Sequence, residues 1–247
     1  MVFFLISIHM FQPVPVPVLP PGGFITALAV SQGDLRVGYC RFDTQRFHDG
    51  LSQTLAIPLP ARLAQAVTRR RAEYLASRFL ARQLLQDLGH ADFLLTNAPD
   101  RSPCWPDGIA ASLSHTRGIA VMAATRQPRC VGIDVEQMMS VETAEETAGM
   151  LMNQAERQLL RALPLPFAAA ATLLFSLKES LYKALWPVIR QPMDFHQAAL
   201  VAVDMPSGEA RLSLTTGLSQ ALPQETLLKA YFRLQPGEVM TLINHPC

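Results

Sequence analysis

Several features that would assign this chain of 247 residues to a common protein class are missing. Its four cysteines include no C-x-x-C pair, so neither a zinc site nor a redox motif is indicated, and a reducing compartment is favoured. Lys and Arg number 21 against 20 Asp and Glu, and a formal charge of +1 provides no overall field for nucleic acid or an anionic membrane. Any anion-binding site must therefore be local.

Long apolar runs are also absent. Residues 1–11 are apolar, but a spanning helix needs roughly 20 such residues, and the basic leader and small-residue cleavage site of an export signal are lacking. We therefore expect a cytoplasmic protein without a membrane span. The proline-rich run 13–21 cannot be helical, because each proline removes a backbone donor and restrains its predecessor. Residues 1–23 are predicted to form an arm, with a poorly ordered leader favoured over a docked edge strand for 1–11.

The remaining chain combines short strands with two long helical patterns. The first pattern runs from 61 to 88, between Pro60 and Gly89, and the second from 167 to 185, before Pro187. Asn153, followed three residues later by Glu156, predicts a helix start between them. Strands are predicted at 35–42, 109–115, 118–124, 130–136, 200–203, 210–214, 227–233 and 239–243. Each half mixes strands with one long helix, so we predict an α/β fold of the α+β kind, with lobes at 24–128 and 129–247.

Two acids lie in the strand predicted at 130–136. Alternate side chains share a face of a strand, so Asp134 and Glu136 project together, while Ile133 and Val135 are expected to point into a core. Taken alone, such a pair is more often a solvated strand face than a site. The apolar neighbours and the helical motif described next favour a functional interpretation.

The helix predicted at 167–185 contains an acid and a base four residues apart, Glu179 and Lys183, preceded by Lys178. Side chains with this spacing lie on one helix face, and an ordinary intrahelical ion pair is the alternative explanation. Together with the two strand acids, Glu179 makes three carboxylates. Magnesium takes one or two protein carboxylates and completes its octahedron with water and phosphate oxygens. The pattern therefore indicates a site for a pyrophosphate.

The first predicted helix has a basic face. Arg69, Arg70 and Arg71 begin it, Arg78 lies seven residues beyond Arg71, and Arg82 follows one turn later. Guanidinium groups grip phosphate through a rigid and often bidentate fork, so this face is a candidate phosphate site. A solvated helix surface is the alternative.

A serine and histidine group ends the strand predicted at 109–115. Ser112 and Ser114 share a strand face, and His115 stands at the strand end. A hydrolase interpretation is disfavoured, because the G-x-S-x-G motif is absent and adjacent strand residues point to opposite faces. Hydrogen bonding to a ligand phosphate suits these side chains better, with a structural histidine as the alternative.

With these motifs in order, the chain resembles the 4′-phosphopantetheinyl transferase superfamily, in the branch typified by enterobactin synthase component D and the surfactin-type enzymes. The resemblance implies two similar, pseudo-symmetric α/β lobes with coenzyme A in the cleft between them. The stretches that carry it are residues 69–78 (RRRAEYLASR), 103–106 (PCWP), 112–115 (SLSH), 132–136 (GIDVE) and 175–183 (FSLKESLYK).

Carried over residue by residue, the resemblance implies an Mg²⁺-dependent transfer of 4′-phosphopantetheine from coenzyme A to a serine of an apo acyl or peptidyl carrier protein, by a monomer. Asp134, Glu136 and Glu179 would hold Mg²⁺, with Glu179 also the general base, directly or through a water, and Lys183 would neutralise phosphate charge. The coenzyme A 3′-phosphate would be bound by Arg71, Arg78, Ser114 and His115, and Lys178 would assist at the phosphates. Two rival functions use the same residues: a metal-dependent nucleotide phosphohydrolase and a non-catalytic coenzyme A binding module.

Four methionines lie between the acidic strand and the helix that starts after Asn153. Methionine side chains make adaptable binding surfaces, so this segment is a candidate docking face for the carrier protein. Core packing is the alternative, and it is at least as well supported, because Glu142, Glu145 and Glu146 would repel an acidic carrier. The four methionines are Met138, Met139, Met150 and Met152.

Overall fold

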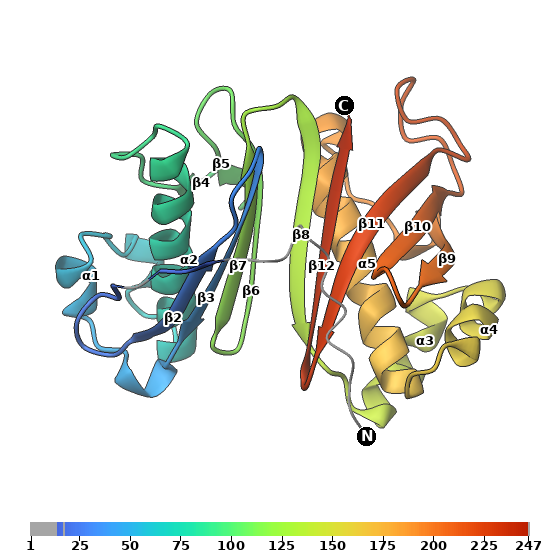
Figure 1. Ribbon diagram of the computed structural model, residues 1–247, viewed down its shortest axis with the longest axis horizontal. Coiled ribbons are helices and arrows are strands. Elements are labelled where there is room, and N and C mark those ends of the chain that lie inside the picture. Colours follow the sequence, from blue (N-terminus) through green and yellow to red (C-terminus); the bar gives the residue numbers. More distant parts are fainter. Residues whose placement is uncertain (1–13, 17, 247) are drawn as a thin grey trace. The chain divides into compact units, whose positions relative to one another are not determined.

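The computed structural model describes residues 14–16 and 18–246 of the chain. Residues 1–11, for which a poorly ordered leader is predicted, lie outside this described part. Two compact units make up the described residues, one ending at Pro128 and the other beginning at Arg129. Each contains a five-stranded antiparallel sheet with one long helix along a face (Figure 1). The predicted α+β class is therefore confirmed.

The unit that ends at Pro128 has the strand order β1-β2-β3-β7-β6. Its long helix α2 (Thr68–Asp87) packs on β3 and β7. The strands are β1 (Val14–Pro15), β2 (Ile25–Val30), β3 (Leu35–Phe42), β6 (Ala110–Thr116) and β7 (Ile119–Thr125). Smaller elements are helix α1 (Leu51–Thr54), 3-10 turns at Thr44–Arg46 and Ala61–Leu63, and the hairpin of β4 (Thr96–Asn97) and β5 (Pro103–Cys104).

The unit that begins at Arg129 has the strand order β8-β12-β11-β10-β9. Its long helix α5 (Phe167–Ile189) packs on β8 and β12, and two shorter helices, α3 (Val141–Leu151) and α4 (Gln154–Ala162), pack against α5. The strands are β8 (Arg129–Gln137), β9 (Ala198–Asp204), β10 (Glu209–Leu214), β11 (Leu227–Gln235) and β12 (Glu238–Pro246). No helix in the described part is long and apolar enough to cross a membrane.

Local sequence signals locate most of these elements. The strands predicted at 35–42, 130–136 and 227–233 correspond to β3, β8 and β11. Helix α4 begins with the predicted capping box, in which Asn153 Oδ1 accepts from the Glu156 amide and Glu156 Oε2 accepts from the Asn153 amide, both at 2.9 Å. The sequence did not predict the strand β2, the helices α1 and α3, or the short strands β1, β4 and β5.

Both predicted long helices have a wrong boundary. The first begins at Thr68 instead of residue 61, because residues 61–63 form a 3-10 turn and Val67, with ψ at 149° and 71% of its surface exposed, has no core to bury it. The second continues past Pro187 to Ile189. Pro187 lies in the last turn, where the loss of one backbone donor does not interrupt the helix, and Arg190 then ends it in the left-handed conformation (φ 48°).

Each long helix packs closely against a glycine of its sheet. A Cβ on Gly38 of β3 would lie 2.4 Å from Leu84 Cδ1 of α2, and a Cβ on Gly132 of β8 would lie 1.8 Å from the Ser180 carbonyl oxygen of α5. The Gly132 contact is the more demanding one, because its neighbour is backbone and not the end of a flexible side chain. Only glycine therefore allows α5 to lie this close to β8.

We expect Gly132→Ala to destabilise the protein, because α5 would have to move away from β8. Overpacking of this kind costs about 1–3 kcal/mol in the free energy of unfolding, measurable by urea denaturation. Gly149→Ala in α3 is the matched control: nothing lies within 4 Å of the new Cβ, so this variant should be as stable as the parent or up to about 1 kcal/mol more stable. Equal stability of the two variants would contradict the close-approach argument.

Candidate functional site

Strand β8 and helix α5 bring the predicted metal-site residues together in one unit. Lys183 Nζ lies 2.6 Å from Asp134 Oδ1, and Asp134 is 1% exposed. Because Gly132 and Asp134 both contact α5, the face of β8 that carries the acids is the face that the helix covers. Ile133 and Val135, on the opposite face of β8, are both fully buried, as predicted, although neither belongs to the apolar cluster that the described residues form around α5.

The acids of this cluster repel one another. Burial raises the pKa of Glu136 to about 7, with further upward contributions from Asp134 and Glu179, while Lys183 opposes them. Burial also raises the pKa of Glu179, again against the effect of Lys183 and together with that of Asp134. One ammonium group therefore compensates three carboxylates only in part, and added positive charge would be favourable here.

The chemistry of these donors suits a hard divalent cation. Carboxylate oxygens are the ligands of Mg²⁺, which needs only one or two of them from the protein. In the described part, no three His, Cys, Asp or Glu side chains are gathered as a complete metal-binding group. The carboxylates that could each supply an oxygen to such an ion are those of Asp134, Glu136 and Glu179, with the ammonium of Lys183 beside Asp134.

A buried hydroxyl network holds α5 against the sheet beside Asp134. Thr241 of β12 is paired with Asp134 across the ladder, and its hydroxyl lies 2.9 Å from Ser176 Oγ and 2.7 Å from Ser180 Oγ. The Thr241 hydroxyl also donates to the Ser176 carbonyl at 2.7 Å, and the Ser180 hydroxyl to the Thr241 carbonyl at 3.1 Å. These bonds fix both the depth and the rotation of the helix that carries Glu179 and Lys183.

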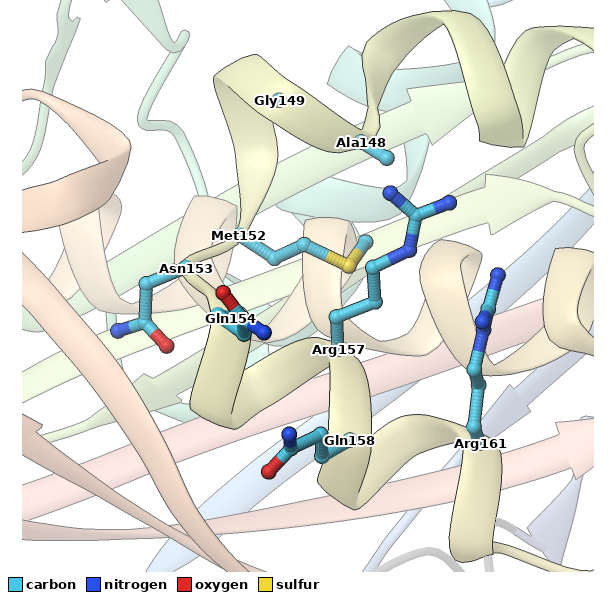
Figure 2. A pocket seen from close by; sticks show the side chains of 8 residues that line it. All are labelled: Ala148, Gly149, Met152, Asn153, Gln154, Arg157, Gln158 and Arg161. Atoms are coloured by element: carbon cyan, nitrogen blue, oxygen red, sulfur yellow. The ribbon is translucent and has the colours of Figure 1, made fainter.

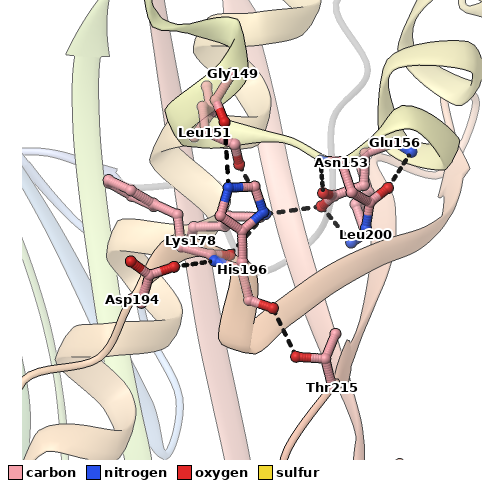
Figure 3. Close-up of polar contacts among 10 residues, drawn as sticks. Gly149, Leu151, Asn153, Glu156, Lys178, Asp194, His196, Leu200 and Thr215 are labelled. Atoms are coloured by element: carbon pink, nitrogen blue, oxygen red, sulfur yellow. Dashed lines mark hydrogen bonds and ion pairs between the residues drawn. The ribbon is translucent and has the colours of Figure 1, made fainter.

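Lys178 lies on another face of α5, away from the acids of β8. Its Nζ is 2.8 Å from Glu156 Oε1 and donates to the carbonyls of Leu151 and Phe195 at 2.9 and 2.8 Å (Figure 3). The side chains of Lys178 and Glu156 are only 2% and 1% exposed. Glu156 also accepts from the Leu200 amide at 2.8 Å, so the predicted phosphate residue Lys178 instead joins α4, β9 and the end of α3 to α5.

We expect Lys178→Met to destabilise the protein strongly, because it leaves the Glu156 carboxylate buried without its cation. Breaking a buried pair in this way costs about 3–5 kcal/mol, to be measured by urea denaturation. The matched control is Lys229→Met, which breaks an exposed pair with Glu209 (2.5 Å) and should change stability little. Similar stability losses in both variants would show that burial of Lys178 is not the cause.

A second group of predicted residues lies in the unit that ends at Pro128. Arg78 and His115 line one cavity of about 470 Å³. Three further arginines line it with them: Arg70, which belongs to the predicted basic face, and Arg62 and Arg101, which the sequence did not single out. Its lining is Arg62, Leu63, Arg70, Tyr74, Arg78, Asn97, Arg101, Pro103, Leu113 and His115. We call this cavity the arginine pocket.

Arg78 is the most buried arginine of the arginine pocket. Its guanidinium lies 4.3 Å from the centre of the Tyr74 ring and donates to Ser77 Oγ at 3.1 Å and to Asn97 Oδ1. Burial lowers the pKa of Arg78, Tyr74 raises it, and the nearby charges of Arg62 and Arg70 lower it further. The guanidinium groups thus repel one another, which an anion would relieve.

His115 is held at the arginine pocket by Glu73 of α2. His115 Nδ1 lies 3.7 Å from Glu73 Oε2, and Arg69 Nε lies 3.5 Å from Glu73 Oε1. Burial raises the pKa of Glu73, while Arg69 and Arg70 lower it. The predicted partners His115 and Arg78 are therefore brought together.

Other predicted residues of this unit are not brought to the arginine pocket. Arg71 pairs with Asp49, with its guanidinium 5.5 Å from the centre of the Phe47 ring, and Arg82 donates to the Leu55 carbonyl at 2.6 Å. Leu113 and His115 line the cavity, so the alternating Ser112 and Ser114 lie on the opposite face of β6.

The methionine segment is only partly a surface. Met150 is 58% exposed, whereas Met152 is 5% exposed, and Met138 and Met139 pack against the core. A cavity of about 570 Å³ lies between α3 and α4, where Met152 and the side chains of Arg157 and Arg161 line it (Figure 2). Both arginines are already engaged with Glu145, at 2.5 and 3.8 Å. Core packing thus accounts for three of the four methionines.

Comparisons with known proteins place both units in one family. The model described as "4′-phosphopantetheinyl transferase N-terminal domain" matches residues 59–125, and that of the "4′-phosphopantetheinyl transferase superfamily" matches residues 130–233. Enterobactin synthase component D of Salmonella typhi is 34% identical over 203 residues, which cover 82% of this chain and 83% of that protein.

Two further relatives match over a shorter stretch or at lower identity. Enterobactin synthase component D of Escherichia coli (strain K12) is 35% identical over 146 residues, 59% of this chain and 68% of that protein. The 4′-phosphopantetheinyl transferase PptT of Mycobacterium tuberculosis is 31% identical over 198 residues, 75% of this chain and 85% of that protein. The resemblance inferred from the ordered motifs is confirmed, and the chain belongs to the 4′-phosphopantetheinyl transferase superfamily.

Proposed function

We propose that this chain is an Mg²⁺-dependent enzyme that transfers 4′-phosphopantetheine from coenzyme A to a serine of an apo acyl or peptidyl carrier protein, releasing 3′,5′-adenosine bisphosphate. The observation that carries the proposal is the cluster of Asp134, Glu136, Glu179 and Lys183, built in the part of the chain that matches the superfamily. The similarity to enterobactin synthase component D favours a carrier protein of nonribosomal peptide, and in particular siderophore, assembly. We further propose that it acts as a monomer in the cytoplasm.

The acids of β8 and α5 bind the metal in this proposal. Asp134 and Glu136 supply carboxylate oxygens from the strand, and Glu179 supplies a third from the helix. When bound, Mg²⁺ supplies positive charge that holds the pyrophosphate of coenzyme A and stabilises charge that develops on it. Burial, together with repulsion by Asp134 and Glu179, raises the pKa of Glu136, and this supports the role because a bound cation would stabilise the charged carboxylates.

Lys183 and Glu179 act on the reacting groups in this proposal. Lys183, which pairs with Asp134 in this structure, moves its charge to the phosphate oxygens as the bond to the leaving group breaks. Glu179 accepts the proton of the carrier serine, directly or through a water. The serine oxygen attacks the β-phosphorus of coenzyme A, and the bisphosphate leaves. Phosphoryl transfer depends mostly on positioning and charge stabilisation, so no protein nucleophile is needed.

The arginine pocket is the proposed site of the coenzyme A 3′-phosphate. Arg78 and His115 are its predicted ligands, and Arg62, Arg70 and Arg101 add positive charge at the same cavity. The chain before Pro128 contains no lysine, so all its fixed side-chain cations are planar guanidinium groups suited to a phosphate. Arg71, Ser114 and Lys178 were predicted as further ligands, and their contacts here give this role less support than that of Arg78 and His115.

Intact-mass analysis of an apo carrier protein, incubated with this protein, coenzyme A and Mg²⁺, tests the proposal. The carrier should gain about 340 Da, the mass of one phosphopantetheine group. Asp134→Ala, folded by circular dichroism, should lose about 10² to 10³ in rate. Release of free phosphopantetheine with an unmodified carrier would indicate a phosphohydrolase. Coenzyme A binding that does not depend on Mg²⁺ and leads to no turnover would indicate a binding module.

We expect Arg78→Ala to weaken binding of coenzyme A far more than binding of dephospho-coenzyme A, which lacks the 3′-phosphate. A charge-assisted contact of this kind contributes about 1.5–3 kcal/mol to the binding free energy, measured by calorimetry. Arg46→Ala is the control, since Arg46 is exposed and pairs only loosely with Asp43 (3.5 Å) outside the arginine pocket. Equal weakening of both ligands by Arg78→Ala would place the 3′-phosphate elsewhere.

Substitutions of Glu179 and Lys183 should have different kinetic effects, although the two residues share a helix face. Glu179→Gln lowers metal affinity and basicity, so part of its activity should return at high Mg²⁺ or with Mn²⁺. Lys183→Met keeps the apolar stem and removes the charge, so kcat should fall more than coenzyme A affinity, and added metal should not restore it. Measuring kcat and coenzyme A binding across a magnesium series separates the two. Poor binding with normal turnover in Lys183→Met would make Lys183 a ground-state clamp.

A further inference from the structure

Asn97 connects the basic side chains of the arginine pocket. Its Oδ1 accepts from Arg78 Nη2 and, at 3.2 Å, from Arg62 Nη2, and its Nδ2 donates to the Arg101 carbonyl at 2.7 Å. Asn97 belongs to β4 in the hairpin with β5, whereas Arg78 is in the middle of α2 and Arg62 is in the 3-10 turn that precedes it. One amide thus joins three separate segments of the chain at this cavity.

The amide solves a problem that the arginines create. Guanidinium groups lining one cavity repel one another, and long side chains lose rotamer freedom when they are held in place. A neutral carbonyl oxygen that accepts from two of them keeps both near each other without removing any of their charge. A carboxylate at the same position would hold them equally well but would cancel one positive charge that a phosphate ligand needs.

Asn97 completes the set of contacts that hold the Arg78 guanidinium. That guanidinium lies against the Tyr74 ring and its Nη1 donates to Ser77, so that its Nη2 is directed to Asn97. Arg62 is mostly exposed, and the bond to Asn97 ties its end to the cavity. Preorganised donors bind an anion better than mobile ones, because less ordering is required on binding.

We propose that Asn97 is a positioning residue that holds Arg62 and Arg78 in the arrangement that grips the 3′-phosphate of coenzyme A, and that Arg62 is a second guanidinium ligand of that phosphate. The proposal rests on the function proposed above, since it assigns the arginine pocket to coenzyme A. It adds two residues to those the motifs indicated, and it explains why an amide and not an acid stands between the two arginines.

Calorimetry with coenzyme A and dephospho-coenzyme A, on the full-length protein, tests the proposal. Asn97→Ala should weaken coenzyme A binding roughly five- to tenfold and dephospho-coenzyme A binding less than about twofold. The KM for coenzyme A should rise by a similar factor while kcat at saturation is unchanged. Arg62→Ala should likewise weaken coenzyme A binding more than dephospho-coenzyme A binding. A merely structural defect would instead weaken both ligands alike, and that result would overturn the proposal, as would unchanged binding of both.

Two additional variants show whether Asn97 acts through the arginines. In an Arg62→Ala, Arg78→Ala background, Asn97→Ala should cause no further loss of coenzyme A affinity, whereas an undiminished further loss would show that it acts independently. Asn97→Asp is isosteric and should keep the hairpin folded, yet it should weaken coenzyme A selectively because it withdraws one charge. This variant carries the test if Asn97→Ala lowers the midpoint of thermal unfolding.

Asn244→Ala is the matched control. Asn244 Oδ1 accepts from Arg129 Nε at 2.6 Å, so this change also removes an asparagine–arginine contact, but in the unit that begins at Arg129, and it should leave both affinities unchanged. Selective loss in Arg78→Ala but not in Asn97→Ala would reject the role of Asn97 and leave the proposed function standing. Absence of the carrier mass shift would reject the proposed function itself.

Discussion

The close contact between α5 and β8 is the constraint on which the candidate active site depends. Gly132 provides no side chain where the Ser180 carbonyl passes, so the helix lies close enough for Lys183 to reach Asp134 at 2.6 Å. Thr241 then holds the helix through the hydroxyls of Ser176 and Ser180. A larger residue at position 132 would move Glu179 and Lys183 of α5 away from the acids of β8, even though every polar side chain of the site would still be present.

Lys178 and Lys183 lie on different faces of α5, and the face decides whether the charge of each lysine is buried in an ion pair or left accessible to a ligand. Lys178 is enclosed by Glu156 and two backbone carbonyls, and its three donors are all used to join α5 to neighbouring segments. Lys183, five residues later, faces β8 and pairs with Asp134 while remaining partly exposed. A buried ion pair is costly to desolvate, so Lys178 stabilises one arrangement of α3, α4 and α5, whereas Lys183 keeps its charge available for a ligand.

The arginine pocket follows a different principle. Its guanidinium groups come from α2 and from loops on either side of it, and none of the described residues that line it is an acid. Glu73 of α2 pairs with His115 and Arg69. Positive charge is thus concentrated in one cavity of a chain whose net charge is only +1, as the composition required of any anion site. Neutral partners, Asn97 and the Tyr74 ring, hold Arg78 without cancelling its charge.

Local sequence patterns were sufficient for the class of the fold, most strands and the capping box at Asn153, because each depends on neighbours within a few residues. They could not separate Arg70 from Arg71, since helical spacing from Arg78 favours Arg71, and only its contact with the distant Asp49 shows that it turns away. Nor could they show that β8 presents its acids to α5, or that Lys178 is enclosed. Those assignments depend on which surfaces meet when separate segments pack, and tertiary structure alone decided them.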